Sequence, residues 1–460
     1  MTDGKRTENR RLYLAVDIGG TKIQSSLVEE SGAIIARERV RTPREGGSAE
    51  VLVALESAMQ QVLSDPAVRP KGIAGIGVAV PGVVEPRTGR VVVTPNMNLT
   101  GVELGPHLED RFRVPVAIGN DCNLGTLGEA WLGSARNAES VVGMFVGTGL
   151  GGGFVRKGKL WRGAREAAME VGHTVMQIGG RLCGCGNKGC LEAVASRSAI
   201  ERDIREGVAQ GRPTAINEML AGDLGQIRSG TLRKALEQGD ELVTEVVHRA
   251  ANVLGHACLT IRHILDPEVI VLGGGVVEAC HAYILPIVEG IVAGDNLPGA
   301  RDAGHVVLSA LGDDAVVLGA AALAARHAGR NPFKKKYRFA PSYPAVVWTR
   351  QGEVLVANQT YTDDVYVRVD GKIKRRRTDG QPGCGDSHMI GAEELEKVCK
   401  GGPTVVFIGT GESGQLQLND AARRYLQQRS IEHHALPTPQ AIVAYNDSNQ
   451  RKAAMFHVTC

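Results

Sequence analysis

Short apolar runs that end at glycine or at a carboxylate recur along the first two thirds of the chain. Between them, apolar residues spaced three or four positions apart predict helices over Glu50–Leu63, Glu241–Leu265 and Asp314–His327. Strands that alternate with helices are typical of α/β units, in which functional residues gather where the strands end. The predicted strands are Leu12–Val16, Ile23–Val28, Gly72–Val80, Val114–Ile118, Val141–Val146 and Val269–Leu272.

Three of these strands run into glycine-rich loops. The first loop, Asp17–Lys22, suits a phosphate-binding hairpin because its paired glycines let the backbone approach phosphate oxygens. Within it, Asp17 can hold Mg²⁺ through water and Thr21 can donate to a phosphate. The other loops are Gly147–Gly149 and Gly273–Gly275. One such loop is as consistent with a plain turn, but three in this order predict a nucleotide held between two lobes.

A polar pair, Asn120-Asp121, follows the strand at Val114–Ile118. A sugar hydroxyl is a weak nucleophile, so phosphoryl transfer to it benefits from a carboxylate that accepts its proton during in-line attack. Asp121 is a candidate for that base. The local residues alone are equally consistent with an Asx turn or with the N-cap of a helix over Gly125–Leu132.

Three cysteines and a histidine form the most informative group in the chain. Cys183, Cys185 and Cys190 lie within eight residues among glycines, and His173 lies ten positions before the first of them. Thiolate and imidazole ligands together favour a tetrahedral structural zinc site. Cysteines one residue apart are poorly placed for an unstrained disulfide, and zinc accounts for all three thiols. We therefore predict zinc in preference to a disulfide or a redox pair.

The ordered set of motifs from about Leu12 to about Ala328 resembles the signature of the ROK family (repressors, open reading frames, kinases), typified by bacterial ROK glucokinases. The resemblance implies a two-lobed actin/hexokinase-like fold with an RNase H-like core in each lobe and a zinc-clipped loop. We place the N-terminal lobe at residues 12–136, completed by 314–329, and the large lobe with the zinc motif at 137–313.

The same resemblance assigns roles to residues and implies ATP, Mg²⁺ and structural Zn²⁺ as cofactors. Asp121 would be the catalytic base. In the family the first two glycine loops bind phosphates and the third binds adenosine, which implies nucleotide contacts at Asp17, Gly19, Gly20, Thr21, Lys22, Gly147, Thr148, Gly149, Gly273 and Gly274. The sugar would contact Asn98, Asn120, Asp121, Glu170, His173 and Glu192. The zinc ligands would be His173, Cys183, Cys185 and Cys190.

Three positions depart from the family pattern. Gly119 stands where many relatives have Glu, which changes the hydrogen bonding near Asp121 more than it affects the base itself. Val102 stands in place of Trp in the segment that assigns Asn98, and Asn96 is a competing register for the same asparagine.

Residues 330–339 combine glycine, proline and a run of lysines, and they predict a linker. The residues beyond it predict a separate α/β domain over 340–460. That domain resembles a small family that includes adipogenesis-associated and mitochondrial complex I assembly proteins, on the residues Gly409–Gly414, Thr438, Ala441, Tyr445-Asn446 and Thr459-Cys460. The resemblance implies a fold and no defined activity. The Gly409–Gly414 loop fits either an anion-binding nest or a plain turn.

Short strands and one helix are predicted within this domain, with a hairpin turn at Asp370-Gly371. The strands are Ala345–Trp348, Val354–Ala357, Val365–Val369, Ile373–Arg377, Thr404–Ile408 and Ile431–Ala435, and the helix is Asn419–Gln428.

Composition limits the kinds of binding partner and the cellular location that we expect for the protein. The 460 residues carry a net charge of +3, which gives no reason to expect nucleic acid or an anionic membrane as a partner. The apolar run after the polar residues Met1–Arg11 is too short for a signal peptide, and no stretch approaches a membrane span. Nine cysteines, three of them assigned to zinc, suit a reducing cytoplasm. We expect a cytoplasmic protein that forms a homo-oligomer, a dimer or a tetramer.

The predicted function is ATP-dependent phosphorylation of a hexose 6-hydroxyl, with glucose as the substrate. Other kinases of the type act on N-acetylglucosamine, N-acetylmannosamine, mannose or fructose, and the sequence does not separate these sugars or distinguish ATP from polyphosphate. A ROK-type sugar sensor is a different class. Only eleven residues precede the first predicted strand, which argues against the DNA-binding form of such a sensor. A scaffold whose C-terminal domain recruits a protein partner is a third alternative.

Overall fold

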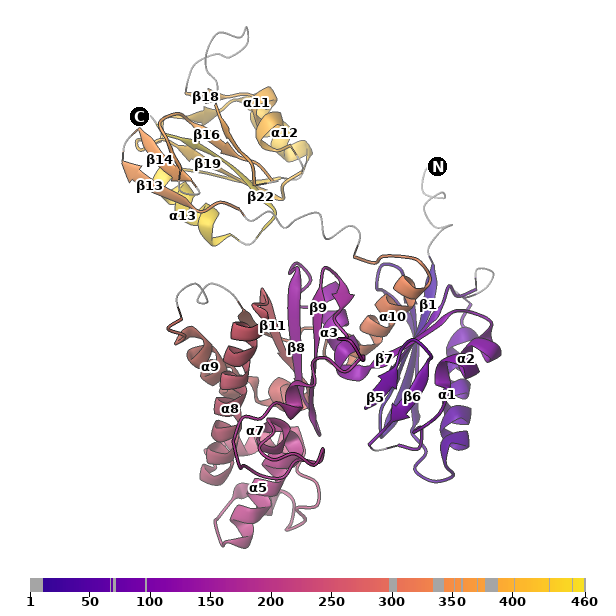
Figure 1. The fold of residues 1–460 in the computed structure, drawn as a ribbon. Helices are drawn as coiled ribbons and strands as arrows, with labels where there is room; N and C mark the ends of the chain where they lie inside the picture. The colour runs from indigo at the N-terminus through magenta and orange to yellow at the C-terminus, as the bar shows by residue number, and fades with distance from the viewer. Residues whose placement is uncertain are drawn as a thin grey trace. The chain divides into compact units, whose positions relative to one another are not determined.

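The structure is a computed structural model of the chain, and it divides into two compact units, Met1–Tyr337 and Arg338–Cys460 (Figure 1). It describes all residues except 1–10, 67, 69–71, 96, 298–303, 334–342, 351, 357–358, 370, 377–387, 401, 430, 449 and 459–460. Asn96, Asp370, Thr459-Cys460 and the predicted linker from residue 334 on therefore lie outside the described residues.

The first lobe of the first unit is a five-stranded sheet with helices on both faces. Its strand order is β3-β2-β1-β4-β7, with β1, β4 and β7 parallel and β2 and β3 antiparallel. Because the parallel strands β1, β4 and β7 are buried on both faces, they read as near-continuous apolar runs. The elements are β1 (Leu12–Ile18), β2 (Lys22–Glu29), β3 (Ile34–Arg41), β4 (Ile76–Val80) and β7 (Val116–Asn120), with α1 (Ser48–Leu63) and α2 (Leu104–Phe112) on one face and α3 (Asp121–Trp131) and α10 (Ala315–His327) on the other. A short hairpin joins β5 (Val83–Glu85) to β6 (Arg90–Val93).

The second lobe repeats this plan with strand order β10-β9-β8-β11-β12. Its largest core lies between the sheet and a layer of helices in which α8 packs against α9. The strands are β8 (Ser140–Val146), β9 (Leu150–Arg156), β10 (Lys159–Leu160), β11 (Val269–Gly273) and β12 (His305–Leu308). The helices are α4 (Glu192–Ala195), α5 (Arg197–Ala209), α6 (Ala215–Met219), α7 (Ser229–Glu237), α8 (Glu241–Leu265) and α9 (Gly275–Ala293), with short 3-10 turns η1 (Val171–His173) and η2 (Gly312–Asp314).

Helices α3 and α10 cross at very close range. A Cβ added to Gly319 would lie 1.7 Å from the carbonyl oxygen of Leu124, and one added to Gly128 would lie 2.0 Å from that of Ala315. Only glycine permits two helix backbones to approach this closely. Since α3 also packs on β8 and β9, this crossing joins the two lobes.

The buried carboxylate of Glu129 strengthens the same junction. Its Oε1 accepts hydrogen bonds from Ser309 Oγ (2.7 Å) and from the backbone amides of Ala310 (3.0 Å) and Leu311 (2.9 Å). Its Oε2 accepts from the amide (2.8 Å) and the hydroxyl (3.0 Å) of Ser134. Five donors satisfy the buried charge, so α3 is fixed to the segment that follows β12.

The second unit has a five-stranded sheet of order β17-β16-β22-β19-β21, in which β19, β21 and β22 are parallel. Helices α11 and α12 share one core with the sheet, and α13 lies in the core on the other side with β13 and β14. The elements are β13 (Val346–Arg350), β14 (Glu353–Val356), β15 (Gln359–Tyr361), β16 (Val365–Val367), β17 (Ile373–Arg375), β18 (Met389–Ile390), α11 (Ala392–Val398), β19 (Val405–Thr410), β20 (Gln417–Leu418), α12 (Asp420–Gln428), β21 (Glu432–Leu436), α13 (Thr438–Asp447) and β22 (Lys452–His457).

One predicted boundary needs correction. Phe333 is fully buried in the core that contains α3 and α10, and it packs against Gly158. The beginning of the predicted 330–339 linker therefore belongs to the first unit. One described helix, α9, is long and apolar enough to cross a membrane by length and composition. Its Val276, Ile284 and Val288 are buried in the core of the second lobe.

The position of Phe333 predicts where the chain can be divided. A chain that ends after Tyr337 should fold with the stability of the first unit, whereas one that ends after Gly329 should lose about 3–5 kcal/mol of stability, because it lacks the buried Phe333 ring. Urea unfolding of both shortened chains checks this. Equal stability of the two chains would contradict it.

Candidate functional site

A cleft of about 1190 Å³ lies between the two lobes of the first unit. The ends of β1, β7 and β8 and the start of α9 all contribute to its lining. Of the predicted site residues it is lined by Asp17, Gly19, Gly20, Lys22, Asn120, Asp121, Gly147, Thr148, Gly149, Glu170, His173, Cys183, Cys185, Glu192 and Gly274. The parallel strands explain this convergence, because their carboxyl ends meet at one edge of each sheet.

The turn between β1 and β2 forms the first glycine loop. The amide of Gly19 donates to the carbonyl of Lys22 (2.8 Å), and Thr42 Oγ1 donates to the carbonyl of Gly19 (2.5 Å). The Lys22 ammonium lies 3.0 Å from Asp313 of η2. Thr21 is exposed and does not line the cleft. The hairpin is therefore held in shape by its own backbone and by Thr42, and Lys22 lines the cleft beside it.

Two carboxyl groups, those of Asp17 and Asp121, line the cleft and interact electrostatically. Burial raises the pKa of Asp17 to about 7, and the charge of Asp121 adds to this rise while Lys22 opposes it. Burial also raises the pKa of Asp121, and hydrogen bonds from the Cys122 amide oppose that rise. Such a pair tends to hold protons or to gather positive charge.

Asn120, and not Asp121, caps helix α3. Its Oδ1 accepts from the amide of Asn123 (3.1 Å), and its Nδ2 donates to the carbonyl of Gly82 (3.0 Å). The helix begins four residues earlier than the predicted Gly125, at Asp121 itself. The role of helix N-cap therefore belongs to Asn120 and not to Asp121. The Asp121 carboxylate lines the cleft from the first turn of the helix.

The zinc motif and the second glycine loop are joined through Glu192. Its Oε2 accepts a hydrogen bond from the amide of Leu150 (2.9 Å), and a Cβ added to Gly149 would lie 2.5 Å from the same oxygen. The loop is also held from α5, where Arg197 Nη2 donates to Thr148 Oγ1 (2.7 Å). Gly149 therefore permits a close approach that a larger residue would prevent.

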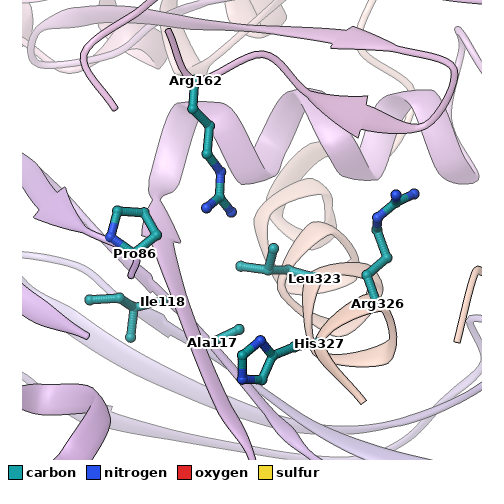
Figure 2. A pocket seen from close by; sticks show the side chains of 7 residues that line it. All are labelled: Pro86, Ala117, Ile118, Arg162, Leu323, Arg326 and His327. Atoms are coloured by element: carbon teal, nitrogen blue, oxygen red, sulfur yellow. The ribbon is translucent and has the colours of Figure 1, made fainter. Parts of the chain in front are cut away.

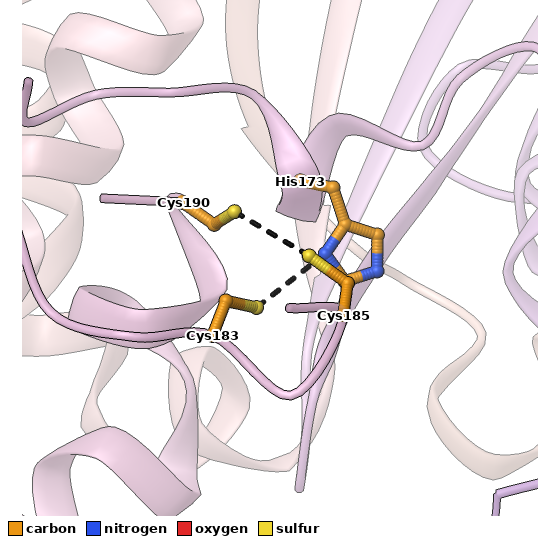
Figure 3. A group of neighbouring side chains, drawn as sticks. All are labelled: His173, Cys183, Cys185 and Cys190. Atoms are coloured by element: carbon orange, nitrogen blue, oxygen red, sulfur yellow. Dashed lines mark hydrogen bonds between the residues drawn. The ribbon is translucent and has the colours of Figure 1, made fainter. Parts of the chain in front are cut away.

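His173, Cys183, Cys185 and Cys190 form one cluster, in which one ligand atom from each residue lies within 4.8 Å of all the others (Figure 3). The Sγ atoms of Cys185 and Cys190 are 3.7 Å apart, and Cys183 Sγ is 3.6 Å from His173 Nδ1. Tetrahedral coordination at a Zn–S distance of about 2.3 Å requires sulfur atoms roughly 3.8 Å apart. The donor set and spacing fit a zinc ion.

The third glycine loop precedes α9. Gly274 has φ +85°, and a Cβ there would collide with the backbone of Val146, so only glycine fits. Its amide donates to Glu278 Oε1 (3.2 Å), and both residues line the cleft. Gly273 is buried against the ring of Phe145 and does not line the cleft.

The structure does not bring Asn98 to the cleft. Its side chain is exposed and is not among the residues that line the cavity. The prediction for this residue therefore has no geometric support. Sequence reasoning also missed cleft residues, among them Asp313 and Arg202. Asp313 lies in the short turn η2 and Arg202 lies within α5, and neither element was predicted from the sequence.

A second cavity of about 240 Å³ lies elsewhere in the first unit, and Figure 2 shows its lining. Arg326 Nη1 donates to the carbonyl of Gly158 (2.7 Å), and Arg162 lies 3.6 Å from Glu166. None of the predicted site residues lines this cavity, so the larger cleft is the candidate site. The lining residues are Pro86, Ala117, Ile118, Arg162, Leu323, Arg326 and His327.

Comparison with known proteins agrees with this geometry. A family model described as "ROK family" matches residues 13–327. The chain belongs to the ROK family. A glucokinase of Halalkalibacterium halodurans is 34% identical over 313 residues, which is 67% of this chain and 93% of that protein. The match confirms the two-lobed α/β fold expected for the first unit.

The relatives include a kinase of known structure and a transcriptional regulator. The ROK family glucokinase from Streptomyces griseus, solved in complex with glucose and AMPPNP, superimposes with a TM-score of 0.59 at 29% identity, covering 68% of this chain and 99% of that one. The DNA-binding transcriptional dual regulator NagC of Escherichia coli is 28% identical, over 71% of this chain and 79% of NagC. The family thus includes both kinases and repressors.

Residues 348–457 match a second family model, described as "Protein of unknown function (DUF498/DUF598)". A separate C-terminal domain is therefore confirmed. Its resemblance to adipogenesis-associated and complex I assembly proteins stays a prediction.

The raised pKa of Asp17 predicts that its ionised carboxylate lowers the folding stability of the ligand-free protein at high pH. Between about pH 4 and pH 7 the folded protein retains a proton that the unfolded chain has lost, so stability falls as the pH rises through this interval. Asp17→Asn should therefore stabilise the nucleotide-free protein at pH 8 by about 2 kcal/mol, less than the full shift because the cleft is solvated. The gain should vanish near pH 4.

Urea unfolding at pH 5 and pH 8 checks this, with the exposed Asp110→Asn as the control. A gain that does not change with pH would contradict the assignment.

Proposed function

We propose that the first unit is an ATP-dependent hexose kinase that transfers the γ-phosphoryl group to the 6-hydroxyl of glucose. The observation that carries the proposal is the position of Asp121, a partly buried carboxylate at the cleft floor where the glycine loops of both lobes meet. The cleft that Asp121 lines is also lined by residues of all three glycine loops, which supports a role for this carboxylate beside a bound nucleotide.

Asp121 acts as the general base in this mechanism. The sugar 6-hydroxyl gives its proton to the carboxylate as its oxygen attacks the γ-phosphorus in line with the leaving oxygen. Burial raises the pKa of Asp121, which makes it a stronger proton acceptor than a solvated carboxylate. The neighbouring amide of Asn120, with Glu170, His173 and Glu192, would hold the other hydroxyls.

The glycine loops would hold ATP. Space is open above Gly147, where an added Cβ meets no atom within 4 Å, and Gly19, Gly20 and Gly274 also line the cleft. Backbone amides at such glycine turns suit phosphate oxygens. Lys22 would leave its ion pair with Asp313 and bind a phosphate group of ATP instead.

The residues present fit a bound Mg²⁺. The charge of Asp121 adds to the raised pKa of Asp17, and a divalent cation beside Asp17 would relieve this repulsion. When bound, Mg²⁺ neutralises charge on the phosphates during transfer.

The zinc ion would have a structural role. Burial raises the pKa of Cys183 to about 12, and a thiolate there is stable only with a cation beside it. His173, Cys183, Cys185 and Cys190 would hold the ion, and Glu192, two residues after the last cysteine, would keep its bond to Leu150. The ion would thus set the positions of Glu170 and Glu192.

A sugar sensor without catalysis is the second candidate, because ROK relatives include repressors. It would use the same sugar-binding residues and would not need Asp121 as a base. Cytoplasmic location, homo-oligomer formation and the choice among hexoses stay predictions.

Asp121→Asn should lower kcat about 10²–10⁴-fold and leave sugar affinity comparatively unchanged, because Asn keeps the size and one acceptor but accepts no proton. The matched variant is Glu192→Gln, in which the main effect should be weaker sugar binding and not a lower kcat. Steady-state kinetics with glucose and Mg-ATP, with calorimetric glucose binding, separate the two. Near wild-type kcat in Asp121→Asn would show that the base assignment is wrong.

Purified protein should carry one zinc per chain, and Cys190→Ser should lose it together with glucose binding. Structural zinc contributes on the order of 10–16 kcal/mol of apparent binding energy in small motifs, so its loss should disorder the loop. Elemental analysis measures the metal, and Cys258→Ala, a buried cysteine of α8 outside the cluster, serves as the control. Full activity in zinc-free protein would contradict this role.

A further inference from the structure

Polar side chains gather at one edge of the second unit's sheet. Asp364 comes just before β16, Arg376 just after β17, and Thr410 and His457 end β19 and β22. The registers place these positions together, because Val365 pairs with both Arg375 and Phe456 while Thr410 pairs with His457. This is the carboxyl edge of the parallel strands, where ligands bind in open α/β sheets.

A buried hydrogen-bonded network occupies that edge. The Oδ2 of Asp364 accepts from Arg376 Nη1 (2.9 Å) and from His457 Nδ1 (2.7 Å), and its Oδ1 accepts from the amide of Val458 (2.9 Å). Arg376 also donates to both carboxylate oxygens of Glu394 (2.7 and 3.1 Å). The two carboxylates and the guanidinium satisfy one another, as buried charges require.

His457 is the exception in this network. Its residue is 2% exposed, and its Nε2 is buried without a hydrogen-bond partner among the described residues. The carboxylate of Asp364 can only accept, so Nδ1 must donate to it, and in the neutral ring Nε2 carries the lone pair. Buried polar atoms without a partner are rare, and an Asp-oriented imidazole with an open Nε2 is the arrangement of an acid–base residue.

The surroundings of His457 are those of a ligand site. The half-exposed ring of His388 lies 5.6 Å from its ring, centroid to centroid, at 79°. The hydroxyl of Thr438 donates to the carbonyl of His457 (2.7 Å) and accepts from the amide of Gly411 (2.9 Å). It thereby ties the loop after β19 to the end of β22. This loop has left-handed glycines at Gly411 and Gly414, and residues 412–415 are exposed.

We propose that this edge is a second ligand site, independent of the kinase cleft, for a small hydroxylated anion such as a hydroxy acid or a phosphorylated alcohol. Its hydroxyl donates to His457 Nε2, and its anionic group meets the backbone amides of the exposed residues 412–414. If the hydroxyl proton is transferred, it moves to Nε2, and Asp364 stabilises the imidazolium that forms. The loop supplies the anion contact, and the unpartnered imidazole marks the place of the hydroxyl.

Carbethoxylation with diethyl pyrocarbonate tests the proposal on the full-length protein, since the reagent is ligand-sized and modifies unprotonated imidazole nitrogen. Mass spectrometry compares the rate at His457 with that at the exposed His433. A ligand site predicts modification of His457 in the folded protein within about tenfold of the His433 rate. A ring that only fills the core predicts modification after unfolding alone, and that result would overturn the proposal.

Asp364→Asn should slow the modification of His457, because a neutral amide is a weaker acceptor for Nδ1–H than a carboxylate and leaves Nε2 less nucleophilic. The neighbouring exposed Asp363→Asn is the matched control and should leave the rate unchanged. Cooperative urea unfolding of each variant reports whether the unit remains folded. An undiminished His457 rate in folded Asp364→Asn would refute the oriented imidazole.

Millimolar glycerol 3-phosphate should protect His457 at least threefold, and more than glycerol or inorganic phosphate alone. Equal protection by phosphate would reject the hydroxyl contact, and no protection by any of the three would reject the ligand class.

Discussion

The close crossing of α3 and α10 is the contact on which the rest of the first unit depends. Glycines at positions 128 and 319 let the two helix backbones meet, and buried Glu129 fixes α3 to the segment after β12. Asp121 opens α3, so the same crossing that joins the lobes also fixes the proposed base. A larger side chain at either glycine would move the base away from the glycine loops as it separated the helices.

A second dependence runs through the zinc loop. His173 lies in η1 beside β9, where a Cβ added to Gly172 would lie 1.9 Å from the carbonyl of Leu150. Glu192 accepts from the amide of that same residue. The loop that would bind the sugar is thus attached to the turn that would bind phosphate. A zinc ion at the proposed site would stiffen this attachment and would take no part in the chemistry.

Much of the fold could be predicted because the strands are buried on both faces and the long helices have one apolar stripe. The predicted helix Glu241–Leu265 has the bounds that the structure gives to α8. Helix α9 was missed because Pro286 and Gly290 interrupt its pattern. Strand β22, central in its sheet, was missed because its six residues include no β-branched side chain, whereas the equally buried β19 is rich in valine and isoleucine.

The candidate site was predictable where a motif ends a strand, as at Asp17 and Asp121. It was not predictable where a contact joins residues far apart in the chain, such as the bond from Leu150 to Glu192 or the pairing of Lys22 with Asp313. Asn98 is the opposite case. A motif assigned it to sugar binding, but its exposed position does not support that role. Motifs identify chemical groups, whereas their mutual distances depend on packing between lobes.

The central claim, that the first unit is a glucose kinase, is tested most directly by an assay of the zinc-loaded, full-length protein against a panel of hexoses. Each hexose is tested with Mg-ATP and with polyphosphate as donor, and NMR identifies the product. The account predicts that glucose with ATP gives the highest kcat/KM and that the product is glucose 6-phosphate. Binding of glucose without turnover of any hexose by either donor would contradict it and would identify the first unit as a sugar sensor.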